Sequence, residues 1–95
     1  MVRIELRNDG WFEAGKDAKD TFPIGYLIYQ SKKVLKERLE KIGEQESISE
    51  LEKKLREIPE LFQFKRTPYL VGNNVMIDTP GLPGQCYLGS IMAEE

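Results

Sequence analysis

The feature that most constrains the fold is a run of residues, 23–42, in which apolar side chains recur with the 3.6-residue period of an α-helix. Pro23 suits the first turn of a helix, and Gly43 stands where a helix commonly stops. Asp20 or Thr21 is available as a side-chain cap. We therefore predict a helix over 23–42 whose apolar stripe is buried against another layer. The stripe consists of Ile24, Leu27, Ile28, Ser31, Val34, Leu35, Leu39 and Ile42.

A second helix is expected over 48–57. Ser47 precedes Glu50 by three residues, which is the spacing of a capping box, and Pro59 ends the pattern. Only a few residues separate the two helices, so they should form an antiparallel hairpin. The apolar stripe of the second helix consists of Ile48, Leu51, Leu55 and Ile58.

Outside the helices the apolar period changes from about 3.6 to 2, which is typical of strands. Residues 2–7 alternate between apolar and charged, and 8–10, Asn-Asp-Gly, favour a tight turn that leads into a short return strand at 11–13. The Pro- and Gly-rich residues 79–84 predict a loop of fixed shape. The order β-β-α-α-β-β-β-β predicts an α+β fold, with a helical hairpin on a mainly antiparallel sheet. The remaining strands are expected at 61–65, 69–71, 75–77 and 86–92, with a turn at 72–74.

Length and composition limit the class of protein. The chain has 95 residues, enough for one domain (1–95) with one modest core. Hydrophobic residues make up 40% and the formal net charge is −2, which fits a globular domain rather than a general polyanion binder. No apolar run is long enough to cross a membrane and the first residues are not a signal peptide, so we expect no membrane association and a cytoplasmic, intracellular location.

Several kinds of catalytic and metal site are excluded by residue type. The chain contains no histidine, which removes Ser-His-Asp and Cys-His catalysis and every His-ligated metal site within one chain. Its one cysteine, Cys86, cannot form an intrachain disulfide or a four-cysteine zinc site, and it is expected to be a buried, unreactive thiol. We expect no enzymatic activity, no catalytic residues, no cofactor and no metal.

Two short segments match parts of nucleotide-binding motifs. Residues 10–16 fit G-x-x-x-x-G-K of a phosphate-binding loop, and 78–81 resemble the Asp-x-x-Gly segment of GTPases. Asp17 stands where the loop needs a hydroxyl for Mg²⁺, and bulky Trp11 and Phe12 would keep the backbone from a phosphate. We interpret both segments as turns.

Three alternatives for binding remain open at this stage. A small ligand, perhaps nucleotide-like, could bind the turns of 72–84 through Asn73, Asn74, Asp78 and Thr79. A nucleic acid, which we consider unlikely, could contact the five basic residues of 32–41, although the six glutamates of 44–60 oppose their field. A protein partner could cover apolar side chains that the core of one small domain cannot bury.

Two parts of the chain carry more apolar side chains than one core can bury. Tyr26 and Tyr29 make the first turns of the 23–42 helix apolar almost all round, so these turns are either core or an interface. The C-terminal strands carry adjacent apolar residues, and successive strand side chains point to opposite faces. One member of each pair can meet the helices; the other should meet a partner on the opposite sheet face. The candidate interface residues are Tyr26, Tyr29, Tyr69, Leu70, Val71, Met76, Ile77, Tyr87 and Leu88.

The leading functional hypothesis is therefore a small, non-enzymatic protein-binding or regulatory module. Its partner would be a second copy, giving a homodimer, or another protein. Compact chains of this kind are common among inhibitors and accessory proteins of viruses and other mobile elements. This is a general association and is not deduced from particular residues of the chain.

Overall fold

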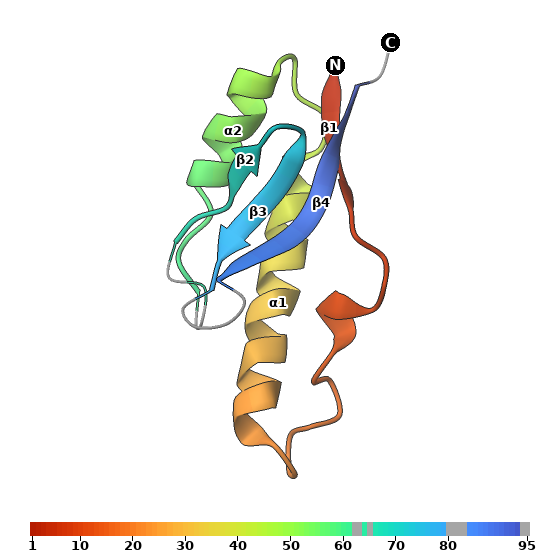
Figure 1. Cartoon of the computed structure of the whole chain (residues 1–95), viewed down its shortest axis with the longest axis vertical. Helices are drawn as coiled ribbons and strands as arrows, with labels where there is room; N and C mark the ends of the chain where they lie inside the picture. Colours follow the sequence, from red (N-terminus) through yellow and green to blue (C-terminus); the bar gives the residue numbers. More distant parts are fainter. Residues whose placement is uncertain (62–63, 65, 80–83, 94–95) are drawn as a thin grey trace.

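A computed structural model of the chain describes residues 1–61, 64, 66–79 and 84–93. Two helices pack on one face of a four-stranded antiparallel sheet, so the predicted α+β fold is confirmed (Figure 1). The elements are β1 (Val2–Leu6), a 3-10 turn η1 (Trp11–Glu13), α1 (Pro23–Ile42), α2 (Ile48–Arg56), β2 (Tyr69–Val71), β3 (Asn74–Asp78) and β4 (Gln85–Ala93).

The strand order in the sheet is β1-β4-β3-β2, which places β1 and β2 at the edges. The first and last strands of the chain lie side by side, with Ile4 opposite Ile91 (Figure 1). Their backbones approach closely because residue 89 is glycine. A Cβ atom there would lie 2.4 Å from the carbonyl oxygen of Glu5.

The prediction of a return strand at 11–13 was wrong, because these residues form η1 instead. Gly10, with φ of 87°, turns the chain out of the sheet, so residues 11–13 do not pair with the edge of β1 that β4 leaves open. As part of η1, Phe12 is buried in the core. Of the strand predicted at 61–65, residues 62, 63 and 65 lie outside the described residues, and Leu61 forms an isolated bridge with Phe64.

Both helices form as predicted, with one difference at a cap. Helix α2 is capped by Ser47, whose hydroxyl accepts a hydrogen bond from the amide of Glu50 at 3.3 Å. The N-cap of α1 is Phe22 and carries no side-chain hydrogen bond, so neither Asp20 nor Thr21 acts as the cap. Pro23 at the first helical position has no amide, so this helix end has one unsatisfied backbone donor fewer.

The core lies between the helices and the inner face of the sheet. Leu35 and Leu39 of α1 are buried, as the helical stripe predicted. The other buried apolar residues are Phe12, Leu51, Leu55, Ile58, Phe64, Val75, Ile77, Leu88 and Ile91.

Only part of α1 belongs to this layered arrangement. The molecule measures 46 × 21 × 20 Å, and Figure 1 shows the N-terminal half of α1 extending beyond the sheet. The segment between η1 and α1 runs back along one side of this projecting half, where Gly15 lies against the backbone of Gly25. Among the described residues, no helix has the length and apolar character needed to cross a bilayer.

Candidate functional site

The outer edge of β1 offers backbone groups for a hydrogen-bonding partner. At one end, the amide of Val2 donates to the carbonyl of Gln45 and the amide of Gln45 donates back, both at 2.8 Å. Peptide groups alternate in direction along a strand, so the amides and carbonyls of Ile4 and Leu6 point the same way as those of Val2. Among the described residues, Gln45 alone pairs with this edge of β1.

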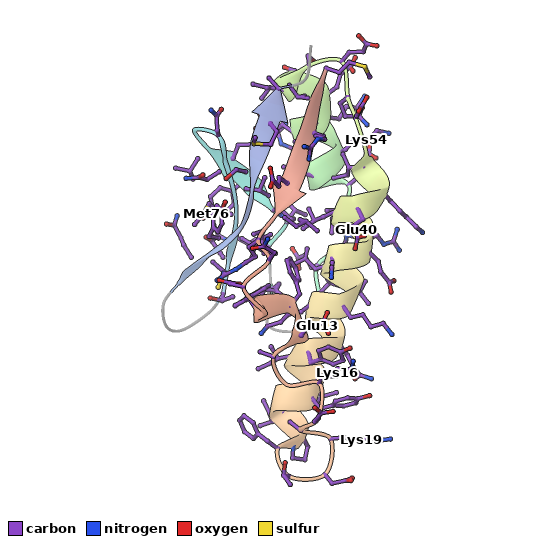
Figure 2. The ribbon with its side chains drawn as sticks, turned by 90° about the vertical axis from the view of Figure 1, so that its right-hand side faces the viewer. Glu13, Lys16, Lys19, Glu40, Lys54 and Met76 are labelled. Carbon is purple, nitrogen blue, oxygen red and sulfur yellow. The ribbon has the colours of Figure 1, made fainter. Side chains whose placement is uncertain are left out.

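A groove runs along this edge, between β1 and α1. It consists of two adjoining hollows of about 430 and 360 Å³, which share Leu6 and Lys36. Figure 2 shows β1 beside α1, with Glu40 on the helix and Glu13 beyond the end of the strand. Half-buried Ile4 and Leu6 of β1 supply apolar surface, and Leu39 and Phe12 close the two hollows at the core. The remaining lining residues are Arg3, Glu5, Glu40, Gly43 and Glu44 in the first hollow and Arg7, Asn8, Gly10 and Glu13 in the second. We call this feature the β1 groove.

Arg7 orders the far end of the β1 groove. Its guanidinium makes a two-point contact with Asp9, in which Nε donates to Oδ1 at 2.9 Å, and a second nitrogen donates to the carbonyl of Tyr87 at 2.9 Å. It also lies 5.3 Å from the ring centre of Trp11. The hydrogen bonds from Arg7 lower the pKa of Asp9 to about 2. The turn at 8–10 is thus held by charge as well as by backbone geometry.

Lys32 attaches the 3-10 turn to α1. Although charged, it is only 8% exposed, and its Nζ donates to the carbonyl of Trp11 at 3.0 Å and lies 4.4 Å from the indole centre. Burial lowers the pKa of Lys32 because the protonated form loses hydration. Lys36, one turn on, lies 3.7 Å from the carboxylate of Glu13 and forms the middle of the groove wall.

The residues predicted as an interface on the sheet divide between its two faces. Ile77 and Leu88 are buried in the core and Leu70 packs against it, so these three are not interface residues. Their neighbours Val71, Met76 and Tyr87 lie on the opposite face, and Figure 2 shows Met76 on the side turned away from α1. The expected division of each pair is therefore observed. That a partner covers the outer face stays a prediction.

The outer face is more polar than the sequence runs suggested. The hydroxyl of Tyr69 donates to Asp78 at 2.5 Å and accepts from Gln85 at 2.8 Å, and this bond to Asp78 raises the pKa of Tyr69. Arg66 lies 3.6 Å from the second oxygen of Asp78. A second polar pair, Tyr87 with Ser90, lies further along β4.

The residues of the small-ligand alternative are not brought together. Asn73 and Asn74 lie at one end of β3, whereas Asp78 and Thr79 lie at the other. Asn74 and Asp78 have side-chain partners on the sheet, and Thr79 lies 3.8 Å from the sulfur of Cys86. Residues 80–83 of the predicted fixed loop lie outside the described residues.

The basic residues of 32–41 do not form one face. Lys32 is buried and Lys36 lies beside Glu13, whereas Arg38 and Lys41 point toward α2, where they line a groove of about 300 Å³. Residues 10–16, which match part of a phosphate-binding loop, also lack the helix that follows such a loop. No helix begins at Lys16, because α1 starts only at Pro23.

Tyr26 and Tyr29 are both half-buried, with ring centres 5.9 Å apart on the projecting half of α1.

The sequence pattern alone did not predict the β1 groove. One signal was available: alternating charges on a short strand, such as Arg3, Glu5 and Arg7, are typical of a sheet edge.

Within the part of the chain that the structure describes, no group of three or more Cys, Asp or Glu side chains could hold a metal ion. Comparison with known proteins finds no matching family model, no matching curated protein and no matching solved structure.

Proposed function

We propose that this chain is a protein-binding module that captures an extended segment of a partner protein by adding it to the edge of β1. The observation that carries the proposal is the β1 groove, which places the unpaired edge of β1 beside a hollow lined by both apolar and charged side chains. Addition of a strand to a sheet edge is a recurrent mode of peptide recognition, in which backbone hydrogen bonds supply affinity and pockets for alternate side chains supply specificity.

The groove indicates the chemistry of the captured segment. Every second side chain of an added strand would point toward α1, over half-buried Ile4 and Leu6 and beside Lys36. The side chains between them would lie on the outer face of the sheet, next to exposed Glu5. The preferred segment therefore has apolar residues at alternate positions and a lysine or arginine facing Glu5.

Such binding accounts for a regulatory or inhibitory role without catalysis or a cofactor. A module that holds an extended segment withholds it from any other protein that needs it. This is the mode of action that we propose for the chain.

Nuclear magnetic resonance of the labelled full chain tests the proposal. The probe is a short, blocked synthetic peptide with valine at alternate positions, threonine between them, and one lysine placed to face Glu5. We expect the peptide to slow hydrogen exchange at the amides of Ile4 and Leu6, which face the free edge. A peptide with proline at its central position should bind more weakly, because proline cannot donate a ladder hydrogen bond.

A charge swap supplies the matched control. Glu5→Lys should weaken binding of the lysine peptide several-fold, and a peptide with glutamate at that position should recover it. Glu37→Lys, an equal charge change on the exposed face of α1, should leave binding unchanged. Exchange at Ile4 and Leu6 that no peptide slows, even at millimolar concentration, would contradict the proposal, as would peptide-induced shifts confined to the outer sheet face.

A further inference from the structure

The groove of about 300 Å³ between α1 and α2 gathers positive charge from both helices. Arg38 and Lys41 are three residues apart and lie on the same side of α1. Lys54 lines the groove from α2. Among the described residues that line it, Glu57 is the one acid, so positive charge exceeds negative charge in the groove.

Two of the three cations are left without an ion pair by the described part of the chain. Arg38 and Lys41 are both exposed, and neither lies within ion-pair distance of a described acid. Lys54 lies 3.9 Å from Glu57, and both side chains are about half exposed, so this contact is weak. The cations of the groove are therefore available to a negatively charged ligand.

The bottom of the groove is apolar. Half-buried Ile42 supplies apolar surface, and Ile58, which is 5% exposed, closes the groove at the core. Sites for small molecules measure about 300–1,000 Å³, so this groove lies at the lower end of that range. A ligand that fits is therefore small, with an anionic group among the cations and an apolar part over Ile42.

The surrounding charges favour one compact anion over a nucleic acid. Residues 44–60 contain six glutamates, which a polymer of phosphates would meet as it left the groove. A phosphate group suits three cations better than a carboxylate does, because it carries up to about two negative charges and three acceptor oxygens. The guanidinium of Arg38 can donate two parallel hydrogen bonds to such a group.

We propose that this groove binds a small organic phosphate, whose phosphate group contacts Arg38, Lys41 and Lys54 and whose apolar part lies over Ile42. The inference goes beyond the capture of an extended segment and uses a different surface. The described lining residues of this groove and of the β1 groove do not overlap.

Nuclear magnetic resonance titration of the full chain with phenyl phosphate, at constant ionic strength, tests the proposal. We expect saturable shifts at the amides of Ile42 and Ile58 and at the side chain of Arg38. The ring protons should show contacts with the methyl groups of Ile42. Phenylacetate, which has the same ring and a single charge, should bind about threefold or more weakly.

Single charge changes separate a binding site from an ordinary helix surface. Lys41→Gln should weaken binding of phenyl phosphate by about threefold or more, because it removes a charged donor. Glu57→Gln should strengthen binding, since it removes the opposing carboxylate and releases Lys54. Lys53→Gln is the matched control, because Lys53 is an exposed neighbour of Lys54 that does not line the groove, and it should bind like the wild type.

Thermal unfolding of the same variants separates binding from a structural role of Lys41. A lysine in the last turn of a helix can stabilise the terminal carbonyls. If that is its role, Lys41→Gln lowers the melting temperature and leaves binding unchanged, which would overturn the proposal.

Three further results would also overturn it: shifts that rise without saturation, equal binding of phenylacetate and phenyl phosphate, or a loss of affinity in Lys53→Gln as large as in Lys41→Gln. A thymidine oligonucleotide that binds more tightly than phenyl phosphate, and that Lys41→Gln weakens, would assign the groove to nucleic acid instead.

Discussion

Two charged side chains near η1 show how single residues shape this fold. Arg7 points outward from β1, yet it binds Asp9 and the backbone of Tyr87, and so joins the turn after β1 to β4. Lys32 is buried on α1 and donates to the backbone of Trp11. Both cations use the face of Trp11, at 5.3 and 4.4 Å from the ring centre. Cation–π contacts therefore contribute to the position of η1.

The Arg7–Asp9 contact makes a prediction at the residue scale. We expect carbon-detected titration of Asp9 to give a pKa of about 2 in the wild type and a value closer to 3.8 in Arg7→Gln, which removes the charged donor. Because the folded-state pKa lies below the unfolded one, the contact stabilises the fold above about pH 4, and this contribution is lost as the pH falls toward 2. Lys16→Gln, at an exposed lysine, is the control; an Asp9 pKa that Arg7→Gln leaves unchanged would contradict the assignment.

At the scale of the elements, α1 does two different things along its length. Its C-terminal half packs Leu35 and Leu39 into the core, whereas its N-terminal half exposes Ile24 and Leu27. The periodicity is the same in both halves. What differs is the layer beside the helix, because the sheet ends before the helix does (Figure 1).

Two neighbouring residues of α1 test this division. Leu35→Ala should lower the free energy of unfolding by about 2–5 kcal/mol, because Leu35 is fully buried and its loss leaves a cavity. Val34→Ala, one position earlier and 36% exposed, should cost less than about 1 kcal/mol at concentrations where the chain is monomeric. Urea unfolding measures both values. Equal costs for the two variants would mean that the facing of α1 is misassigned.

For the whole molecule, one apolar cluster joins every layer. Phe12 of η1, Leu35 of α1, Leu55 of α2 and Leu88 of β4 all belong to it. Because these elements share one core, none can lose its packing without exposing apolar surface on the others.

We therefore expect the chain to unfold in one cooperative transition, as the predicted single domain requires. Trp11, the one tryptophan, reports on η1 and lies 6.1 Å from Phe64, ring centre to ring centre. Its fluorescence and the far-ultraviolet dichroism of the helices should change at the same urea concentration. A fluorescence midpoint well below the helical one would show that η1 and β1 unfold separately.

The helices, their hairpin and the α+β class could be predicted from the sequence alone. Their determinants are local: apolar residues three and four apart, Ser47 with Glu50, and Gly43, which ends α1 with φ of 60°. Such contacts join residues that are neighbours along the chain, so the pattern is visible without knowledge of the rest of the molecule.

The sheet edges, the β1 groove and the projecting half of α1 were decided only by the tertiary structure. Ile4 pairs with Ile91 at the other end of the chain, whereas residues 11–13, the expected return strand, form η1 and do not join the sheet. The same pairing leaves the other edge of β1 beside α1 and thereby creates the groove. Which strands pair depends on how much apolar surface the complete arrangement buries. That quantity depends on residues far apart in the sequence, so no local pattern predicts it.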